Sequence, residues 1–214
     1  DLAASRGQLQ VGPTVALTAT VRDSFGNPAN PTRVVFSTTR GQVTPVSVNT
    51  ASGVARAVLS NTVAGAATVT ARADGVAAAA TTGVTFDPAG AASLSLAAAG
   101  SATVGQPVTV TVMVADAWNN MVADGTPVQF GLAPSSVGTL DRQTGVTVGG
   151  KTTVIVRSTV KGTATVTALT NNHQSSAAVV FLPAAPASLD LTMVGDPVAG
   201  AALPVRARVM DAYQ

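Results

Sequence analysis

The chain repeats itself with a period of about 95 residues, and this period constrains the possible folds more than any other feature. Residues 20–29 (TVRDSFGNPA) return as residues 113–122 (MVADAWNNMV), and the same pattern begins again at Arg208 (RVMDAYQ). The aspartates that mark the pattern are Asp23, Asp116 and Asp211. A period this long with strand-like content predicts tandem domains, not a short-repeat solenoid.

Other sequence anchors keep the same register and set the predicted domain boundaries. GAATVTA at residues 65–71 matches GTATVTA at residues 162–168, and short Pro-containing stretches follow Phe86 and Phe181. We predict a first repeat over residues 1–88, slightly truncated at its start, and a second over residues 89–184. Residues 185–214 hold the first two strands of a truncated third repeat. We therefore interpret the chain as an excerpt of a longer array.

Composition favours strands and excludes several classes of function. Val and Thr are abundant, Glu is absent, and only two Lys are present, which favours an all-β chain. Charged residues are 10% of the chain, hydrophobic residues are 46%, and the formal net charge is +2. Disorder is therefore not expected. The chain has no cluster of basic residues and only seven aromatic residues available for stacking. We therefore expect no nucleic-acid binding.

Cysteine is absent, which removes disulfides, thiolate catalysis and Cys-zinc sites together. The most apolar stretch, residues 89–105, is interrupted by Ser and Gly and falls short of the ~18 apolar residues of a membrane-spanning helix. We expect no membrane span in this segment.

Apolar residues alternate with polar ones along most of each repeat, as in half-exposed antiparallel strands. The predicted strands of the first repeat lie near residues 1–4 (continuing to 11), 14–22, 32–38, 42–48, 53–60, 66–73 and 76–86. Those of the second lie near residues 92–97, 107–115, 126–132, 138–147, 151–158, 163–170 and 175–182. About seven short strands in ~95 residues predict tandem immunoglobulin-like β-sandwiches.

The order of these motifs resembles a known family. A strand ending in Val-x-Asp is followed by a Gly-Asn-Pro turn (residues 23–28, DSFGNP), by Val35-Phe36, and by GAATVTA at residues 65–71. This pattern resembles the bacterial immunoglobulin-like domains of invasin and intimin type, although the second repeat departs from it at residues 119–121. The resemblance implies an extracellular stalk of a bacterial surface protein. It does not imply an adhesive head, because nothing in this chain matches a lectin-like receptor-binding tip.

The repeated aspartate closes a strand before a Gly or Asn turn, and aspartate caps turns by accepting backbone N–H groups. The predicted structural turn residues are Asp23, Gly26, Asn27, Asp116, Asn119 and Asp211. Calcium is the alternative, with Asp23, Asp87, Asp116 and Asp124 as candidate ligands. Calcium takes six to eight oxygens, and the chain has no Asp-x-Asp-x-Asp loop. We therefore expect no metal and no cofactor.

An aromatic residue lies just after the repeated aspartate: Phe25, Trp118 and Tyr213. We expect it to pin the turn onto the end of the sandwich or onto the neighbouring module. Alternatively, it belongs to a sugar- or protein-binding surface. Catalysis is not expected, because the single histidine, His173, has no nucleophile motif beside it and the carboxylates are scattered.

The sequence thus predicts a non-enzymatic extracellular structural stalk of a bacterial surface or adhesin-type protein, whose partners are the neighbouring modules. Two alternatives stay open: a filament or sheath subunit assembled by strand exchange, and an accessory module of a secreted enzyme. The third repeat leaves a related question. Its two strands have an apolar face and are marginal alone in water. Three outcomes are open for this segment: residues outside this chain complete it, it pairs with another copy of the chain, or it is disordered.

Overall fold

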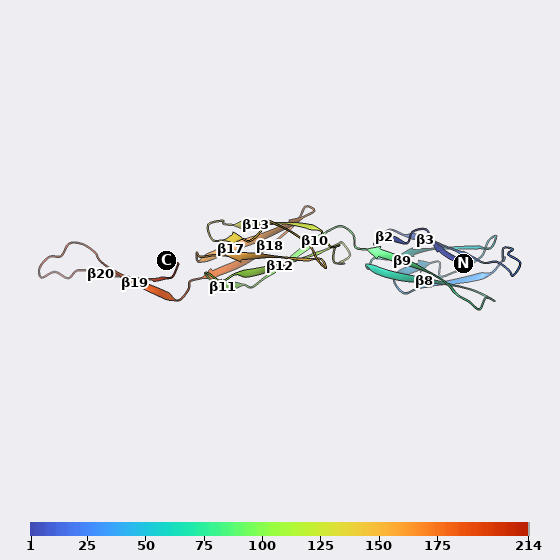
Figure 1. The fold of residues 1–214 in the computed structure, drawn as a ribbon, viewed down its shortest axis with the longest axis horizontal. Coiled ribbons are helices and arrows are strands. Elements are labelled where there is room, and N and C mark those ends of the chain that lie inside the picture. The colour runs from blue at the N-terminus through green and yellow to red at the C-terminus, as the bar shows by residue number, and fades with distance from the viewer. Residues whose placement is uncertain (214) are drawn as a thin grey trace. The chain divides into compact units, whose positions relative to one another are not determined.

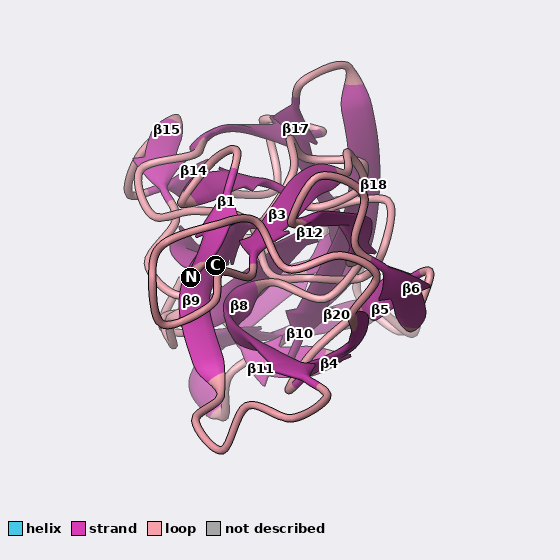
Figure 2. Cartoon of the chain, turned by 90° about the vertical axis from the view of Figure 1, so that its right-hand side faces the viewer, coloured by secondary structure: helices cyan, strands magenta, loops and turns pink. Residues whose placement is uncertain are grey.

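Alternation of small apolar and polar residues builds this chain almost entirely from strands. The computed structural model describes residues 1–213, and these contain strands, turns and loops without a helix (Figure 2). In β3, residues Val15, Leu17 and Ala19 are buried while Ala16 is exposed, as the two-residue period requires. The described residues therefore include no helix long and apolar enough to cross a membrane.

The first repeat folds into two sheets whose strands are mostly antiparallel (Figure 1). One sheet has the order β1-β3-β7-β5 and the other the order β2-β9-β8-β4-β6. The strands are β1 Leu2–Ala4, β2 Gln8–Gln10, β3 Val15–Thr20, β4 Arg33–Thr38, β5 Gln42–Thr44, β6 Ser47–Asn49, β7 Val54–Ser60, β8 Gly65–Ala73 and β9 Ala80–Asp87. Only β2 pairs in parallel, with β9.

The second repeat has the same topology, with sheets β10-β12-β16-β14 and β11-β18-β17-β13-β15. Its strands are β10 Ser93–Ala98, β11 Ser101–Thr103, β12 Val108–Ala115, β13 Pro127–Ala133, β14 Thr139–Leu140, β15 Thr144–Val146, β16 Lys151–Arg157, β17 Gly162–Thr170 and β18 His173–Leu182. Here too the short strand β11 pairs in parallel with the last strand, β18. The predicted all-β fold of tandem immunoglobulin-like sandwiches is confirmed.

Each sandwich closes around its own apolar core. In the first, the fully buried residues include Leu17, Phe36, Leu59, Val69 and Phe86. In the second, they include Val110, Val128, Val154, Val166 and Phe181. Burying a Val, Leu or Phe side chain contributes about 1.5–3 kcal/mol, so each core can hold its sandwich without disulfides.

The expected number of strands needs correction, because each repeat has nine strands and not about seven. The expected strand at residues 42–48 divides at Pro45 into β5, which pairs with β7, and β6, which pairs with β4. Proline has no N–H to donate to a sheet, so the chain changes sheets there. The expected strand at residues 138–147 also divides, without a proline, into β14, which pairs with β16, and β15, which pairs with β13.

Two further expectations shift. The strand expected from residue 76 begins at Ala80, because Gly75 has a positive φ of 77° in a turn that the Val76 N–H closes on the carbonyl of Ala73. Strand β11 was not expected, since three residues are too few to show an alternation. Two Ala-rich stretches, residues 76–80 and 97–99, contain no helix, and Ala97 and Ala98 lie in β10.

Residues 185–213 contain a hairpin of β19 (Pro186–Met193) and β20 (Val205–Asp211), and Gln214 lies outside the described residues. Leu189, Leu191 and Met193 face their partners on β20 and are 61–68% exposed. Val205 and Val209 on β20 are also exposed, whereas Val110 and Val114, at the same repeat positions of β12, are buried. This hairpin therefore repeats the opening strand pair of a sandwich without a second sheet to cover its apolar face.

The contacts divide the chain into two units, Asp1–Ala92 with Ala115–Ala123, and Ser93–Val114 with Asp124–Gln214. The segment Ala115–Ala123 begins at the last residue of β12 and ends before β13, yet its contacts place it in the first unit. The domain boundaries at residues 88 and 184 stay predictions.

A matched pair of phenylalanines tests the core. We expect Phe36→Ala to lower the free energy of unfolding of the first unit by about 3–5 kcal/mol, because Phe36 is 1% exposed and its loss leaves a cavity. Phe25→Ala, at a side chain 89% exposed, should change it by less than about 0.5 kcal/mol. Urea unfolding of both variants measures this, and similar effects of the two would contradict the described core.

Candidate functional site

The repeated aspartate forms the same local turn in the first two repeats. In the second, Asp116 Oδ1 accepts hydrogen bonds from the backbone N–H groups of Trp118 and Asn120, both at 2.9 Å. The Asn120 side-chain amide also donates to Asp116 Oδ2 at 2.9 Å. One carboxylate thereby fixes the five-residue turn, as an aspartate at the start of a turn commonly does.

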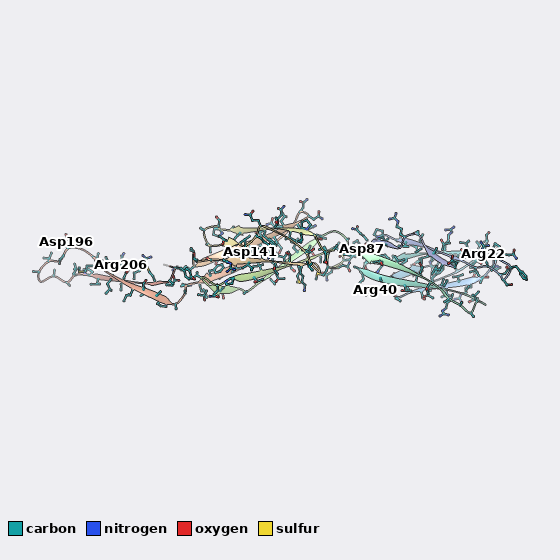
Figure 3. All side chains as sticks on the ribbon, in the orientation of Figure 1. Arg22, Arg40, Asp87, Asp141, Asp196 and Arg206 are labelled. Atoms are coloured by element: carbon teal, nitrogen blue, oxygen red, sulfur yellow. The ribbon has the colours of Figure 1, made fainter. Side chains whose placement is uncertain are left out.

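In the first repeat, Asp23 Oδ1 accepts from the backbone N–H groups of Phe25 at 2.9 Å and Asn27 at 2.8 Å. Arg22 precedes this turn (Figure 3) and donates from Nη1 to the carbonyl of Gly26 at 2.7 Å. The third copy begins alike, because Asp211 Oδ1 accepts from the Tyr213 N–H at 2.9 Å.

A left-handed backbone conformation at one position completes the turn. Gly26 has a φ of 88°, and Asn119, at the equivalent position of the second repeat, has a φ of 65°. Glycine adopts this conformation freely, and asparagine is among the few other residues that tolerate it. The departure of the second repeat at residue 119 therefore preserves the turn.

Hydrogen bonding lowers the pKa of both aspartates. For Asp23, the side-chain and backbone hydrogen bonds of Asn27 hold the carboxyl pKa below its ordinary value. For Asp116, burial raises the pKa, but the hydrogen bonds from Asn120, Ala89 and Trp118 together outweigh it and leave the pKa lowered. Both turns are thus built around an ionised carboxylate.

The second turn makes polar contacts with other parts of the first unit. Asp116 Oδ2 accepts from the Ala89 N–H at 3.0 Å. Asn120 donates from Nδ2 to the carbonyl of Thr62 at 2.9 Å and accepts at Oδ1 from the Ala64 N–H at 2.9 Å. Within this unit, the turn is therefore held at three backbone groups.

Aromatic side chains reinforce two of the turns. A Cβ atom at Gly12 would lie 2.6 Å from Cη2 of Trp118, so the indole ring covers a place that only glycine leaves open. In the second unit, Tyr213 covers Gly105 in the same manner, and Asp211 Oδ2 accepts from the Ala184 N–H at 2.9 Å. Trp118 and Tyr213 are each 44% exposed.

The first turn differs in its surroundings. Phe25 is 89% exposed, and Asp23 and Asn27 are exposed as well. Hydrogen bonds join residues 22–27 to one another. The structure thus holds one exposed and two covered copies of the same aromatic turn.

The four calcium candidates are each occupied by separate partners. Asp87 accepts from the Gln8 side chain at 2.8 Å, and Asp124 accepts from the Gly149 N–H at 2.6 Å. Asp23 and Asp116 serve the turns described above. Residues 1–213 contain no group of three or more His, Cys or acidic side chains placed to hold a metal.

Other charged groups are dispersed. Arg22, Arg40 and Asp87 lie at separate places on the first unit, and Asp141 lies on the second (Figure 3). Asp141 has a lowered pKa, first because it accepts a hydrogen bond from the Ile155 N–H at 2.7 Å and also because of Arg142. Asp141 therefore anchors a strand edge, and its ion pair with Arg142 at 3.2 Å is partly exposed.

Sequence reasoning identified the aspartates and aromatics but missed Asn120, Gly12 and Gly105. All three had a signal, because Asn27 and Asn120 share a repeat position, as do Gly12 and Gly105. The partners at Thr62, Ala64 and Ala89 act through backbone atoms, which carry no signature in the sequence.

The carboxylate of Asp116 can be tested by its effect on stability. Asp116→Ala should lower the free energy of unfolding by about 1–3 kcal/mol at pH 7, because it deprives several partly buried donors of their acceptor. The folded-state pKa is lowered, so this contribution is full above pH ~4 and disappears as the pH falls below that value. Urea unfolding at several values between pH 7 and pH ~2.5 should show the difference in free energy of unfolding between wild type and variant becoming smaller as the pH falls.

Asp190→Ala is the matched control, because Asp190 is exposed on β19 and should change stability by less than about 0.5 kcal/mol. A stability difference between wild type and Asp116→Ala that stayed constant with pH would contradict the role of the ionised carboxylate. A melting temperature that fell sharply on addition of EDTA would instead favour the calcium alternative.

Comparison with known proteins agrees with this architecture. Residues 12–87 match the model of the bacterial Ig-like domain (group 1) family. No curated protein matches the chain by sequence.

Among solved structures, the Escherichia coli adhesin FdeC is 21% identical, with a TM-score of 0.64, over 99% of this chain and 73% of that one. Yersinia pseudotuberculosis InvD is 21% identical, with a TM-score of 0.63, over 99% and 70%. Invasin, described as a bacterial integrin-binding protein, is 24% identical, with a TM-score of 0.51, over 90% of this chain and 42% of that one. The predicted resemblance to bacterial immunoglobulin-like domains of the invasin and intimin type is confirmed.

Proposed function

We propose that this chain is a structural spacer in an extracellular bacterial surface protein of the adhesin type. The observation that carries the proposal is that one sandwich topology occurs twice, each time closed around its own core. Such modules add length to a protein without depending on a ligand. The likeness to FdeC, described as an adhesin, and to invasin supports the surface location.

In the proposed spacer, the turns supply polar contacts that hold loops in place. The polar groups brought together by the turns are one carboxylate, one amide and several backbone groups. That set holds a loop in place and contains no nucleophile with an adjacent base. In this proposal the partners are neighbouring modules, and no cofactor is needed.

Deleting one period in a full-length surface protein that carries this segment tests the spacer role. Removing residues 1–93 joins the preceding residue to Leu94 in register. We expect unchanged surface display and a shorter reach of any distal domain, with a second copy of residues 1–93 having the opposite effect. Distances from the membrane to a fluorescent label on the distal domain measure this.

A deletion that left the label distance unchanged would contradict the spacer. Loss of ligand binding at unchanged reach would assign these modules a binding role instead. A surface-exposed substitution such as Val58→Thr, at a side chain 40% exposed on β7, is the control for nonspecific loss of display.

One observation favours the filament alternative. β20 pairs only with β19 within the described residues, whereas the equivalent strands β3 and β12 also pair with β7 and β16. The apolar side chains Leu189, Leu191 and Val209 are more than 60% exposed beside this open edge. Open strand edges with an apolar face are templates for pairing with another chain.

Comparing residues 1–184 with residues 1–214 by light scattering separates the two roles. If strand exchange occurs, residues 1–214 should assemble in a concentration-dependent way and residues 1–184 should not. Leu191→Asp in the longer chain should abolish this assembly. Equally monomeric behaviour of both chains would remove support for the filament.

A further inference from the structure

The three copies of the aromatic turn differ in one respect that points to a partner. Trp118 and Tyr213 each cover a glycine, at Gly12 and Gly105, and each is 44% exposed. Phe25 occupies the equivalent position in the first repeat and is 89% exposed. The aromatic ring is thus about half covered in the second and third repeats, and almost fully exposed to solvent in the first.

The exposed copy is nevertheless already built. Asp23 accepts the same two backbone N–H groups as Asp116 does, at the residues two and four positions later. The Asn27 amide donates to Asp23 Oδ2 at 3.1 Å, as Asn120 donates to Asp116 Oδ2 at 2.9 Å. The turn therefore holds its bound geometry without a partner, which lowers the entropic cost of docking.

The covered copies show what the partner surface has to offer. It needs a glycine with positive φ under the ring, as at Gly12 (φ 101°) and Gly105 (φ 86°). A linker N–H must face the second carboxylate oxygen, as Ala89 and Ala184 do. For the asparagine, a backbone carbonyl and N–H two residues apart are needed, as at Thr62 and Ala64.

We propose that the turn of residues 23–27 is a docking surface for the end of a further module of this same kind. Phe25 covers the glycine of that module's Val-Gly turn, Asp23 Oδ2 accepts its linker N–H, and Asn27 bonds its backbone carbonyl and N–H pair. This inference rests on the proposed spacer function and adds the contact that orders one module against the next.

A tethered module fits this surface better than a second copy of the chain. The two matching glycines in this chain, Gly12 and Gly105, are already covered by Trp118 and Tyr213. A free second copy therefore offers no open surface of the required kind within the described residues. Each polar contact contributes only about 1 kcal/mol, so docking depends on the high effective concentration that a short linker provides.

A single-tryptophan protein tests the proposal. In a Trp118→Phe background, Phe25→Trp reports the environment of the turn, because Trp118 is the chain's only tryptophan. The reporter is compared in the 214-residue chain and in the same chain preceded directly by a copy of residues 1–93. We expect the added module to shift the emission to the blue and to reduce acrylamide quenching about twofold, in line with exposures of 89% and 44%.

Two asparagine variants of the longer protein serve as matched controls. Asn27→Ala should restore much of the quenching, whereas Asn120→Ala at the equivalent internal turn should leave the reporter unchanged. Equal quenching with and without the added module overturns the proposal, as does an added module that remains protease-sensitive and unfolded beside Asp1. Neither result bears on the reach measured by module deletion, so the spacer function would stand or fall separately.

Discussion

The burial of alternate side chains between two sheets is the constraint on which the rest of this structure depends. Val15, Leu17 and Ala19 in β3, like Val110 and Val112 in β12, bury one face and leave the other to solvent. Each buried Val or Leu contributes about 1.5–3 kcal/mol, whereas each turn hydrogen bond contributes about 1 kcal/mol. The cores therefore decide whether a module folds, and the turns decide only where its loops lie.

This division explains which elements the sequence could predict. Strands of six or more residues, such as β3, β8 and β17, display several periods of alternation and lay close to their expected ranges. Strands of two or three residues, such as β11 and β14, show no full period. Their positions depend on which neighbouring strand offers a free edge, and the local sequence does not contain that information.

The turns show the same limit at the level of single residues. Repetition alone marked Asp23, Asp116 and Asp211, because the same side chain recurs at the same position of each repeat. The receiving groups, at Thr62, Ala64 and Ala89, act through main-chain atoms that every residue except proline possesses. Only the glycine under the ring left a mark in the sequence, since any side chain there would collide with Trp118.

Backbone recognition also explains how the two repeats can differ and still build the same loop. Asn61 closes the receiving loop of the first repeat by bonding both the N–H and the carbonyl of Val63. Ser158 does the same for Val160 in the second, with one hydroxyl in place of an amide. Different side chains thus present equivalent main-chain groups. A repeat array of this kind can diverge in its side chains as long as it keeps the alternating core, the turn aspartate and one glycine.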